Sequence, residues 1–182
     1  MDAILPARDR RLGVRLSYVV AAGMVVAGVL LVVYEVAIRG WEAHLFTGFM
    51  SGIGIQRASS LGSVVVFPAH GQLVGLSLTE GCTAALLVSP FCLIAAGLVA
   101  TRRIGVSRGL LTLAVIAVAL FVVNQLRLVA IAFSVRIWGI ATGYERSHVF
   151  FGTVVSTVGL IGALMLLLLA VSHERKLGPK NG

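Results

Sequence analysis

Charge is scarce in this sequence of 182 residues: 12% of the residues are charged, whereas 58% are hydrophobic. A soluble domain has roughly 45–50% apolar and about 25% charged residues. This composition excludes an ordinary cytosolic enzyme and a disordered tail, and its length predicts one domain. Cysteine is equally rare, with two residues and no C-x-x-C pair. The chain is therefore not a disulfide scaffold, and a structural zinc site or a redox pair is disfavoured.

Several catalytic motifs are also missing. The sequence has no H-E-x-x-H, no pair of carboxylates within an apolar run and no G-x-S-x-G. A metalloprotease, a membrane aspartyl protease and a serine hydrolase therefore lack their parts. The net charge is +8, but the basic residues are scattered between apolar runs and do not form a stripe interleaved with aromatics. Nucleic acid is therefore not an expected partner.

Long apolar runs are what the sequence does contain. They cover residues 16–38, 82–100, 109–135 and 149–172. About 20 apolar residues cross a hydrocarbon core of ~30 Å. The sequence therefore predicts an all-α integral membrane protein with about four transmembrane helices in one domain, 1–182, with basic tails at 1–15 and 173–182. The first run exceeds the 7–15 residues of a signal-peptide core, so we expect a permanent helix.

The basic residues predict the orientation. Ten of the fifteen lie in the two tails and in the short loop between the second and third runs; they are Arg8, Arg10, Arg11, Arg15, Arg102, Arg103, Arg108, Arg175, Lys176 and Lys180. Lys and Arg are enriched in cytoplasmic loops. We therefore expect a multi-pass protein of the cell membrane with both termini in the cytoplasm.

Two loops are then expected on the outer face, at residues 39–81 and 136–147. In the first, apolar residues recur at helical spacing, which predicts a short amphipathic helix on the membrane surface; they are Trp41, Leu45, Phe49, Met50 and Ile53. Residues 63–67 and 73–78 flank the turn-forming segment 68–71. This pattern predicts a short β-hairpin before the second span.

On this topology, three reactive side chains come to the same leaflet from three helices. Cys82 begins the second span from outside, Arg127 lies near the outer end of the third, and His148 begins the fourth. A cysteine nucleophile needs a base or a cation to hold its thiolate and a positive group where the oxyanion develops. Together the three residues meet both needs, although each alone has an ordinary structural explanation.

The other cysteine and histidines are given structural interpretations. Cys92 lies about 15 Å deeper than Cys82 along the same helix and is interpreted as packing. His44 is assigned to the surface helix, His70 to the hairpin turn and His173 to the cytoplasmic tail.

Three short blocks resemble the exosortase/archaeosortase family of membrane transpeptidases. They are Glu80-Gly-Cys82-Thr-Ala, Asn124-Gln-Leu-Arg127 and His148-Val-Phe-Phe-Gly152, in the family's order of Cys, Arg and His. The resemblance implies that Cys82, Arg127 and His148 form the active site and that no metal or organic cofactor is needed. It also implies substrates that are secreted proteins with a C-terminal tail of a short motif, a transmembrane helix and a basic cluster.

This chain departs from the family in two ways. Many relatives have Cys-Ser-Gly where this chain has Cys82-Thr83-Ala84, and larger members have about eight spans. The sequence therefore indicates a compact core, with its own substrate signal.

The expected chemistry is acyl transfer. Cys82, activated by His148, attacks the scissile carbonyl and forms a thioester, while Arg127 stabilises the oxyanion. The acceptor is water, an amine on a membrane lipid or a cell-envelope precursor. Asn124, three residues before Arg127, is assigned either to orienting Arg127 or the substrate or to a plain interhelical hydrogen bond. Glu80 is assigned either to holding Arg127 or His148 in place or to a solvated loop charge, and Thr83 is assigned to the same orienting or substrate-binding group.

Two alternatives stay open from the sequence. The first is a non-enzymatic membrane scaffold or assembly factor whose outer Arg and His bind lipid headgroups or a partner helix. The second is a transporter, since ionisable residues in a membrane also mark ion paths. However, the third run has no second charge deeper in the membrane, and no inverted repeat is visible.

Overall fold

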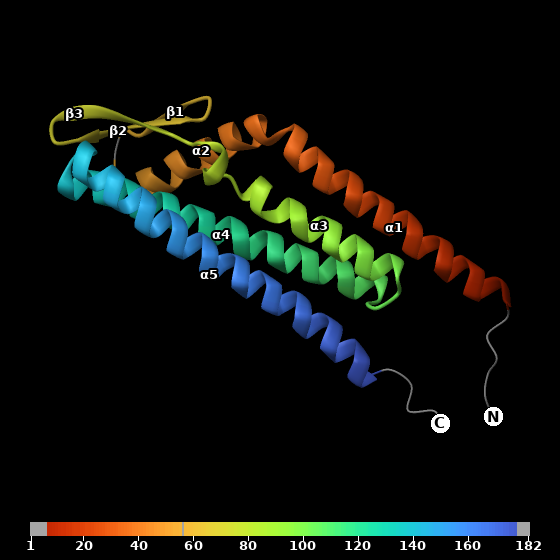
Figure 1. Ribbon diagram of the computed structural model, residues 1–182. Helices are drawn as coiled ribbons and strands as arrows, with labels where there is room; N and C mark the ends of the chain where they lie inside the picture. The colour runs from red at the N-terminus through yellow and green to blue at the C-terminus, as the bar shows by residue number, and fades with distance from the viewer. Residues whose placement is uncertain (1–6, 56, 178–182) are drawn as a thin grey trace.

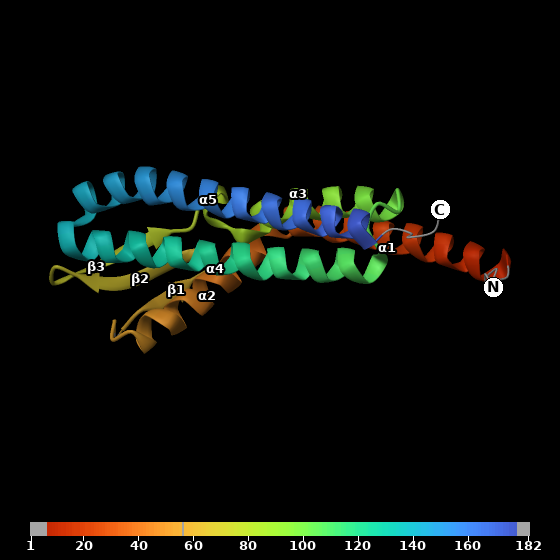
Figure 2. The same ribbon diagram turned by 90° about the horizontal axis from the view of Figure 1, so that it is seen from below.

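The computed structural model describes residues 7–55 and 57–177, with the side chains at 7–12, 141, 144–146, 148–151 and 174–177 outside that description. Within these residues, four helices lie side by side along one direction, and a fifth helix and a small sheet cover one end of them (Figures 1 and 2). The four helices are α1 (Ala7–Val33), α3 (Ala84–Ala100), α4 (Val106–Trp138) and α5 (Ile140–Leu177). The α3–α4 loop, the beginning of α1 and the end of α5 lie at the opposite end (Figure 1).

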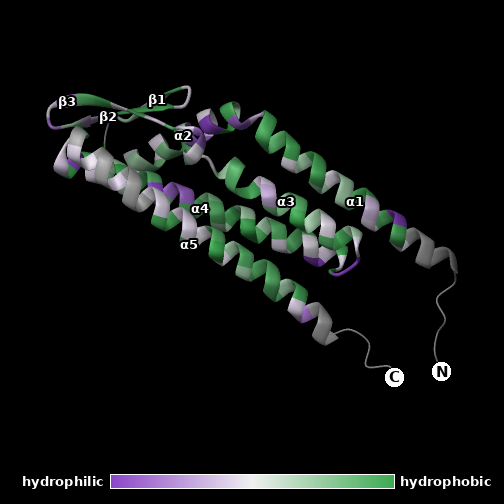
Figure 3. Ribbon diagram, viewed as in Figure 1, coloured by the Kyte–Doolittle hydropathy of each residue, from purple (hydrophilic) through white to green (hydrophobic). Residues whose placement is uncertain are grey.

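Three of the helices are long and apolar enough to cross a membrane. The stretches are Gly13–Val33 in α1, Val106–Trp138 in α4 and Gly152–His173 in α5. Hydrophobic residues cover most of the helix surfaces, and hydrophilic ones gather toward the ends and in one stretch of α4 (Figure 3). This is the architecture of a multi-pass membrane protein. The predicted fourth span corresponds to α3, an apolar helix of 17 residues.

The first predicted span ends earlier than expected. Helix α1 stops at Val33, Tyr34 forms a turn, and α2 (Glu35–Gly52) continues in a new direction (Figure 1). Glu35 and Arg39 form an ion pair of 2.7 Å just after this turn, and Arg39 also donates to the carbonyl of Leu78 at 3.2 Å. Continuing α1 to residue 38 would place Glu35 in hydrocarbon, which is costly. The turn instead carries the ion pair to the end covered by the sheet.

The predicted hairpin is confirmed. Strands β2 (Val64–Ala69) and β3 (Gln72–Ser77) pair antiparallel, from Val64 opposite Ser77 to Ala69 opposite Gln72. The two turn residues, His70 and Gly71, have φ angles of 50° and 75°. Two successive positive φ angles match the twist of a two-residue hairpin. A third strand, β1 (Ser59–Leu61), which the sequence did not predict, pairs with the other edge of β2.

Helix α2 packs one face against the rest of the protein and leaves most of the predicted apolar stripe exposed. Phe46 and Met50 are fully buried against the sheet and α4, whereas Trp41 and Phe49 are 59% and 53% exposed. Burying each large side chain stabilises the fold by about 1.5–3 kcal/mol. The predicted stripe is therefore mainly the outer face of α2, and the buried face includes the polar residue Glu42.

The second predicted outer loop, 136–147, is mostly helical. Helix α4 runs to Trp138, Gly139 alone links the helices with a φ of 81°, and α5 begins at Ile140. The chain reverses tightly here because Gly143 approaches the backbone carbonyl of Ser134, where a Cβ would clash. His148 therefore lies inside α5 and does not follow a loop, and His173 also belongs to α5 and not to a tail.

Candidate functional site

Cys82 lies in the connection between strand β3 and helix α3. After β3, a 3₁₀ turn (Glu80–Cys82) leads through Thr83 into α3. The side chain of Cys82 is 3% exposed, and the Thr79 hydroxyl donates a hydrogen bond to its Sγ at 3.6 Å. The Cys82 amide also donates to the Thr79 carbonyl at 2.8 Å. The turn therefore holds the sulfur in place at the sheet-covered end of the helices.

Two side chains of α4 hold the backbone of this turn. Asn124 donates from Nδ2 to the Cys82 carbonyl at 3.0 Å, and Arg127 donates from Nη1 to the Gly81 carbonyl. Both side chains are buried, at 1% and 5% exposure. Arg127 therefore contacts Gly81, the residue before the cysteine, and Asn124 contacts Cys82 itself. The contacts join the side chains of α4 to the backbone of the turn.

Helix α5 completes the surroundings of Arg127. Its Nη1 also donates to the Ser156 hydroxyl at 3.2 Å. A Cβ added at Gly152 would lie 3.0 Å from Nη2, so the guanidinium packs directly against the backbone of α5. Only glycine leaves this space free.

His148 precedes Gly152 by four residues in α5. Positions four apart in a helix lie on the same face, so 148, 152 and 156 follow one line along α5. The side chain of His148 lies outside the described part of the chain.

Glu42 is a member of this cluster that the sequence did not single out. Its side chain is 1% exposed. One carboxylate oxygen accepts from the Ala84 amide at 2.9 Å and from the Thr83 hydroxyl at 3.4 Å, and the other accepts from Asn124 Nδ2 at 3.4 Å. Glu42 therefore ties α2 to the start of α3 and to α4.

The electrostatics of Glu42 follow from this burial. Desolvation raises the pKa of Glu42 to about 7 from its ordinary 4.5, while the hydrogen bonds from Ala84 and Thr83 act in the opposite direction. A carboxyl group that titrates near neutral pH thus lies one hydrogen bond from Asn124, which in turn holds the Cys82 carbonyl. Strongly shifted carboxyl groups of this kind cluster at functional sites.

The other two predicted site residues, Thr83 and Glu80, differ in their surroundings. Thr83 is buried and caps α3, since its hydroxyl accepts from the Ala85 amide at 3.2 Å while donating to Glu42. Glu80 is exposed, and within residues 7–55 and 57–177 it forms no ion pair with Arg127. The role of Glu80 as an anchor for Arg127 is therefore not seen; the neighbouring Gly81 carbonyl takes that place.

Two buried polar atoms in the cluster keep spare hydrogen-bonding capacity. Asn124 Oδ1 and Arg127 Nε have no hydrogen-bond partner among the described residues. One is an acceptor and the other a donor, and their side chains come from adjacent turns of α4. A peptide group offers the matching donor and acceptor.

No family model, curated protein or solved structure matches the chain. A proposal about the function therefore has to rest on the geometry of the site.

Cys92 and metal binding can be treated briefly. Cys92 is buried in α3, where it packs with Phe91, Ile116 and Leu120 away from the polar cluster. Among the described residues, no three His, Cys, Asp or Glu side chains are grouped closely enough to hold a metal ion. The polar cluster of Glu42, Cys82, Asn124 and Arg127 is called the Cys82 cluster below.

Proposed function

We propose that this chain is a membrane-embedded cysteine peptidase or transpeptidase of the exosortase type. The observation that carries the proposal is the turn Gly81–Cys82, whose two carbonyls are held by buried Arg127 and Asn124. A cysteine in a fixed turn, with a buried cation bound to the preceding carbonyl, meets two needs of acyl transfer: a positioned nucleophile and a nearby positive charge. The buried Arg127 is more than a residue that reaches for solvent, because its guanidinium is enclosed by α4, α5 and the turn.

The proposed reaction has two halves. The Cys82 sulfur attacks the scissile carbonyl carbon, the C–N bond breaks, and a thioester forms. His148 takes the thiol proton and gives it to the leaving amine. In the second half, His148 takes a proton from the acceptor, water or an amine, whose oxygen or nitrogen attacks the thioester and releases the thiol. Arg127 supplies positive charge for the oxyanion in both halves.

The proposal includes a topology with four crossings. Helix α3 has 17 residues, the lower limit for a crossing helix, and it packs side by side with the other long helices (Figure 1). The basic residues then place both termini in the cytoplasm and the Cys82 cluster at the outer face. Secreted proteins with a motif, a helix and a basic cluster at the C-terminus are the substrates that the resemblance suggests.

The decisive experiment is processing of such a tailed substrate in cells that co-express the full chain. Cys82→Ala, Arg127→Ala and His148→Ala each abolish processing, because groups that act in one step are strongly non-additive. Cys92→Ala is the matched control and keeps activity, since Cys92 only packs. A hydroxylamine-sensitive thioester adduct forms with the wild type and is absent from Cys82→Ala. Normal processing by Cys82→Ala would sink the proposal and favour a non-enzymatic scaffold.

A second measurement needs no substrate. Cys82 reacts with an alkylating reagent faster than Cys92 in detergent-solubilised protein. Both cysteines are buried, but Cys82 accepts a hydrogen bond from Thr79 and lies in the turn that Arg127 holds, whereas Cys92 packs among apolar side chains of the helices. His148→Ala slows the reaction at Cys82 and leaves Cys92 unchanged. Equal labelling of the two cysteines, or a rate that is unaffected by His148→Ala, would remove His148 as the base.

A further inference from the structure

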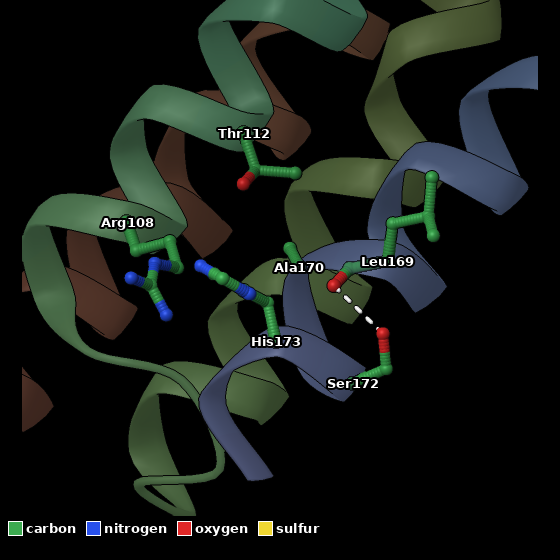
Figure 4. A pocket seen from close by; sticks show the side chains of 6 residues that line it. All are labelled: Arg108, Thr112, Leu169, Ala170, Ser172 and His173. Atoms are coloured by element: carbon green, nitrogen blue, oxygen red, sulfur yellow. Dashed lines mark hydrogen bonds between the residues drawn. The ribbon is translucent and has the colours of Figure 1, made fainter. Parts of the chain in front are cut away.

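A cavity with several polar lining residues lies at the end of the helices opposite the Cys82 cluster. It has a volume of about 440 Å³ between the first turns of α4 and the last turns of α5. Its lining residues are Arg108, Thr112, Leu169, Ala170, Ser172 and His173. The side chains of Arg108 and His173 point toward one another across the space, and Thr112 lies one turn above Arg108 (Figure 4). We call this the Arg108 cavity.

The chemistry of the Arg108 cavity suits a phosphate group. Arg108 brings a guanidinium, the group that pairs best with phosphate oxygens, and Thr112 and His173 bring further donors. None of the six lining residues that the structure describes is acidic. Ser172 is turned away, since its hydroxyl donates to the Leu169 carbonyl at 3.0 Å (Figure 4).

The position of the cavity relates it to a lipid layer. The apolar stretch of α5 ends at His173, and that of α4 begins at Val106. A membrane headgroup layer is therefore expected at this height. Leu111 and Leu169, beside the cavity, are 64% and 61% exposed, as side chains that face acyl chains are. Basic pockets between membrane helices on the cytoplasmic side are typical sites for anionic headgroups.

A separate apolar groove lies farther along the same two helices. It has a volume of about 550 Å³ between α4 and α5, and the described residues that line it are apolar residues and glycines, among them Ala119, Val123, Gly159, Gly162 and Leu166. On α4, positions 108, 112, 115, 119 and 123 are spaced by three or four residues and so follow one face. The rise from 112 to 123 is about 17 Å, which takes the groove deep into the bilayer.

We propose that the Arg108 cavity and this groove together bind one anionic phospholipid. Its phosphate lies between Arg108, Thr112 and His173, and one acyl chain lies in the groove beside Gly162. The apolar groove distinguishes a lipid from free phosphate, because inorganic phosphate has no part that would fill it. This inference is independent of the proposed peptidase activity. In the orientation proposed above, the site faces the inner leaflet.

The test measures binding of a fluorescent phosphatidylglycerol to the purified full chain in mild detergent, with phosphatidylcholine as the zwitterionic reference. Phosphatidylglycerol binds more tightly than phosphatidylcholine. Arg108→Gln weakens phosphatidylglycerol binding about fivefold, the effect of one basic residue near a membrane surface. Arg103→Gln is the matched control, because it removes the same charge from the exposed α3–α4 loop, and it leaves binding unchanged.

The groove has its own variant. Gly162→Leu fills the hollow without a clash, since no atom lies within 4 Å of a Cβ at this position. It weakens the binding of both lipids, and excess inorganic phosphate does not displace phosphatidylglycerol. Thr112→Val keeps the size of the side chain and also weakens phosphatidylglycerol binding. It provides the test if Arg108→Gln does not fold.

Three results would overturn the inference. Equal losses in Arg103→Gln and Arg108→Gln would mean general surface charge. Displacement by inorganic phosphate, with no effect of Gly162→Leu, would mean a free-phosphate site. Equal binding of the two lipids would mean that the cavity does not distinguish an anionic headgroup from a zwitterionic one.

Discussion

Glu42 allows the sharpest quantitative test of the Cys82 cluster. Glu42→Gln keeps the size of the side chain and removes its ionisation. In the folded protein burial raises the pKa of Glu42 to about 7, against the ordinary 4.5 that applies when the chain is unfolded. Between these values the folded chain binds more protons than the unfolded chain, so the free energy of unfolding falls as the pH rises.

The size of this change follows from the shift. One pKa unit corresponds to about 1.4 kcal/mol, so the contribution of Glu42 amounts to about 3 kcal/mol. It is present in full below pH about 4.5, falls through the interval and is gone above pH about 7. Glu42→Gln lacks this component. The difference in unfolding free energy between the variant and the wild type therefore moves by about 3 kcal/mol in favour of the variant across the interval.

The measurement is denaturant unfolding in detergent micelles at a series of pH values between 4.5 and 8. Glu80→Gln is the matched control, because Glu80 is an exposed carboxyl two residues before Cys82. Its unfolding curve has the same pH dependence as the wild type. If Glu42→Gln also keeps the wild-type pH dependence, Glu42 does not titrate in this interval, and its place in the buried cluster is wrong.

Two further predictions concern the helix packing and the topology. Gly152→Ala destabilises the fold by about 1–3 kcal/mol in thermal or denaturant unfolding, because the new Cβ lies 3.0 Å from the Arg127 guanidinium; Gly162→Ala, with open space around it, is neutral or stabilising, and a neutral Gly152→Ala would contradict the packing. A cysteine placed at His70 is labelled from outside intact cells by a reagent that cannot cross membranes, whereas one at Arg103 is protected, and the reverse pattern would put the Cys82 cluster in the cytoplasm.

Those elements that depend on local patterns could be predicted from the sequence. Long apolar runs predicted the helices, and the hairpin followed from two β-rich segments around His70 and Gly71, whose positive φ angles the turn requires. Strand β1 was missed because Ser59-Ser60-Leu61 has no alternating pattern; it is held by pairing with β2 and by contacts with α2.

Glu42 shows why the site could be predicted only in part. In sequence it is a polar residue among the apolar residues Trp41, Leu45 and Phe49, and nothing in that spacing marks it as buried. Its burial depends on α3 and α4, which bring the Ala84 amide and the Asn124 amide group to its carboxylate. The helix periodicity of α2 alone does not reveal those partners, because they belong to other helices.

The length of α4 has a geometric consequence for any substrate of the proposed reaction. Arg127 lies 21 residues beyond Val106 in one unbroken helix, a rise of about 32 Å, which is close to the hydrocarbon thickness of ~30 Å. The helix thus acts as a ruler that fixes the cutting height at the membrane boundary. A scissile bond has to lie within a residue or two of the end of the substrate's own membrane anchor, and a spacer that is longer by one helical turn would carry it past Cys82.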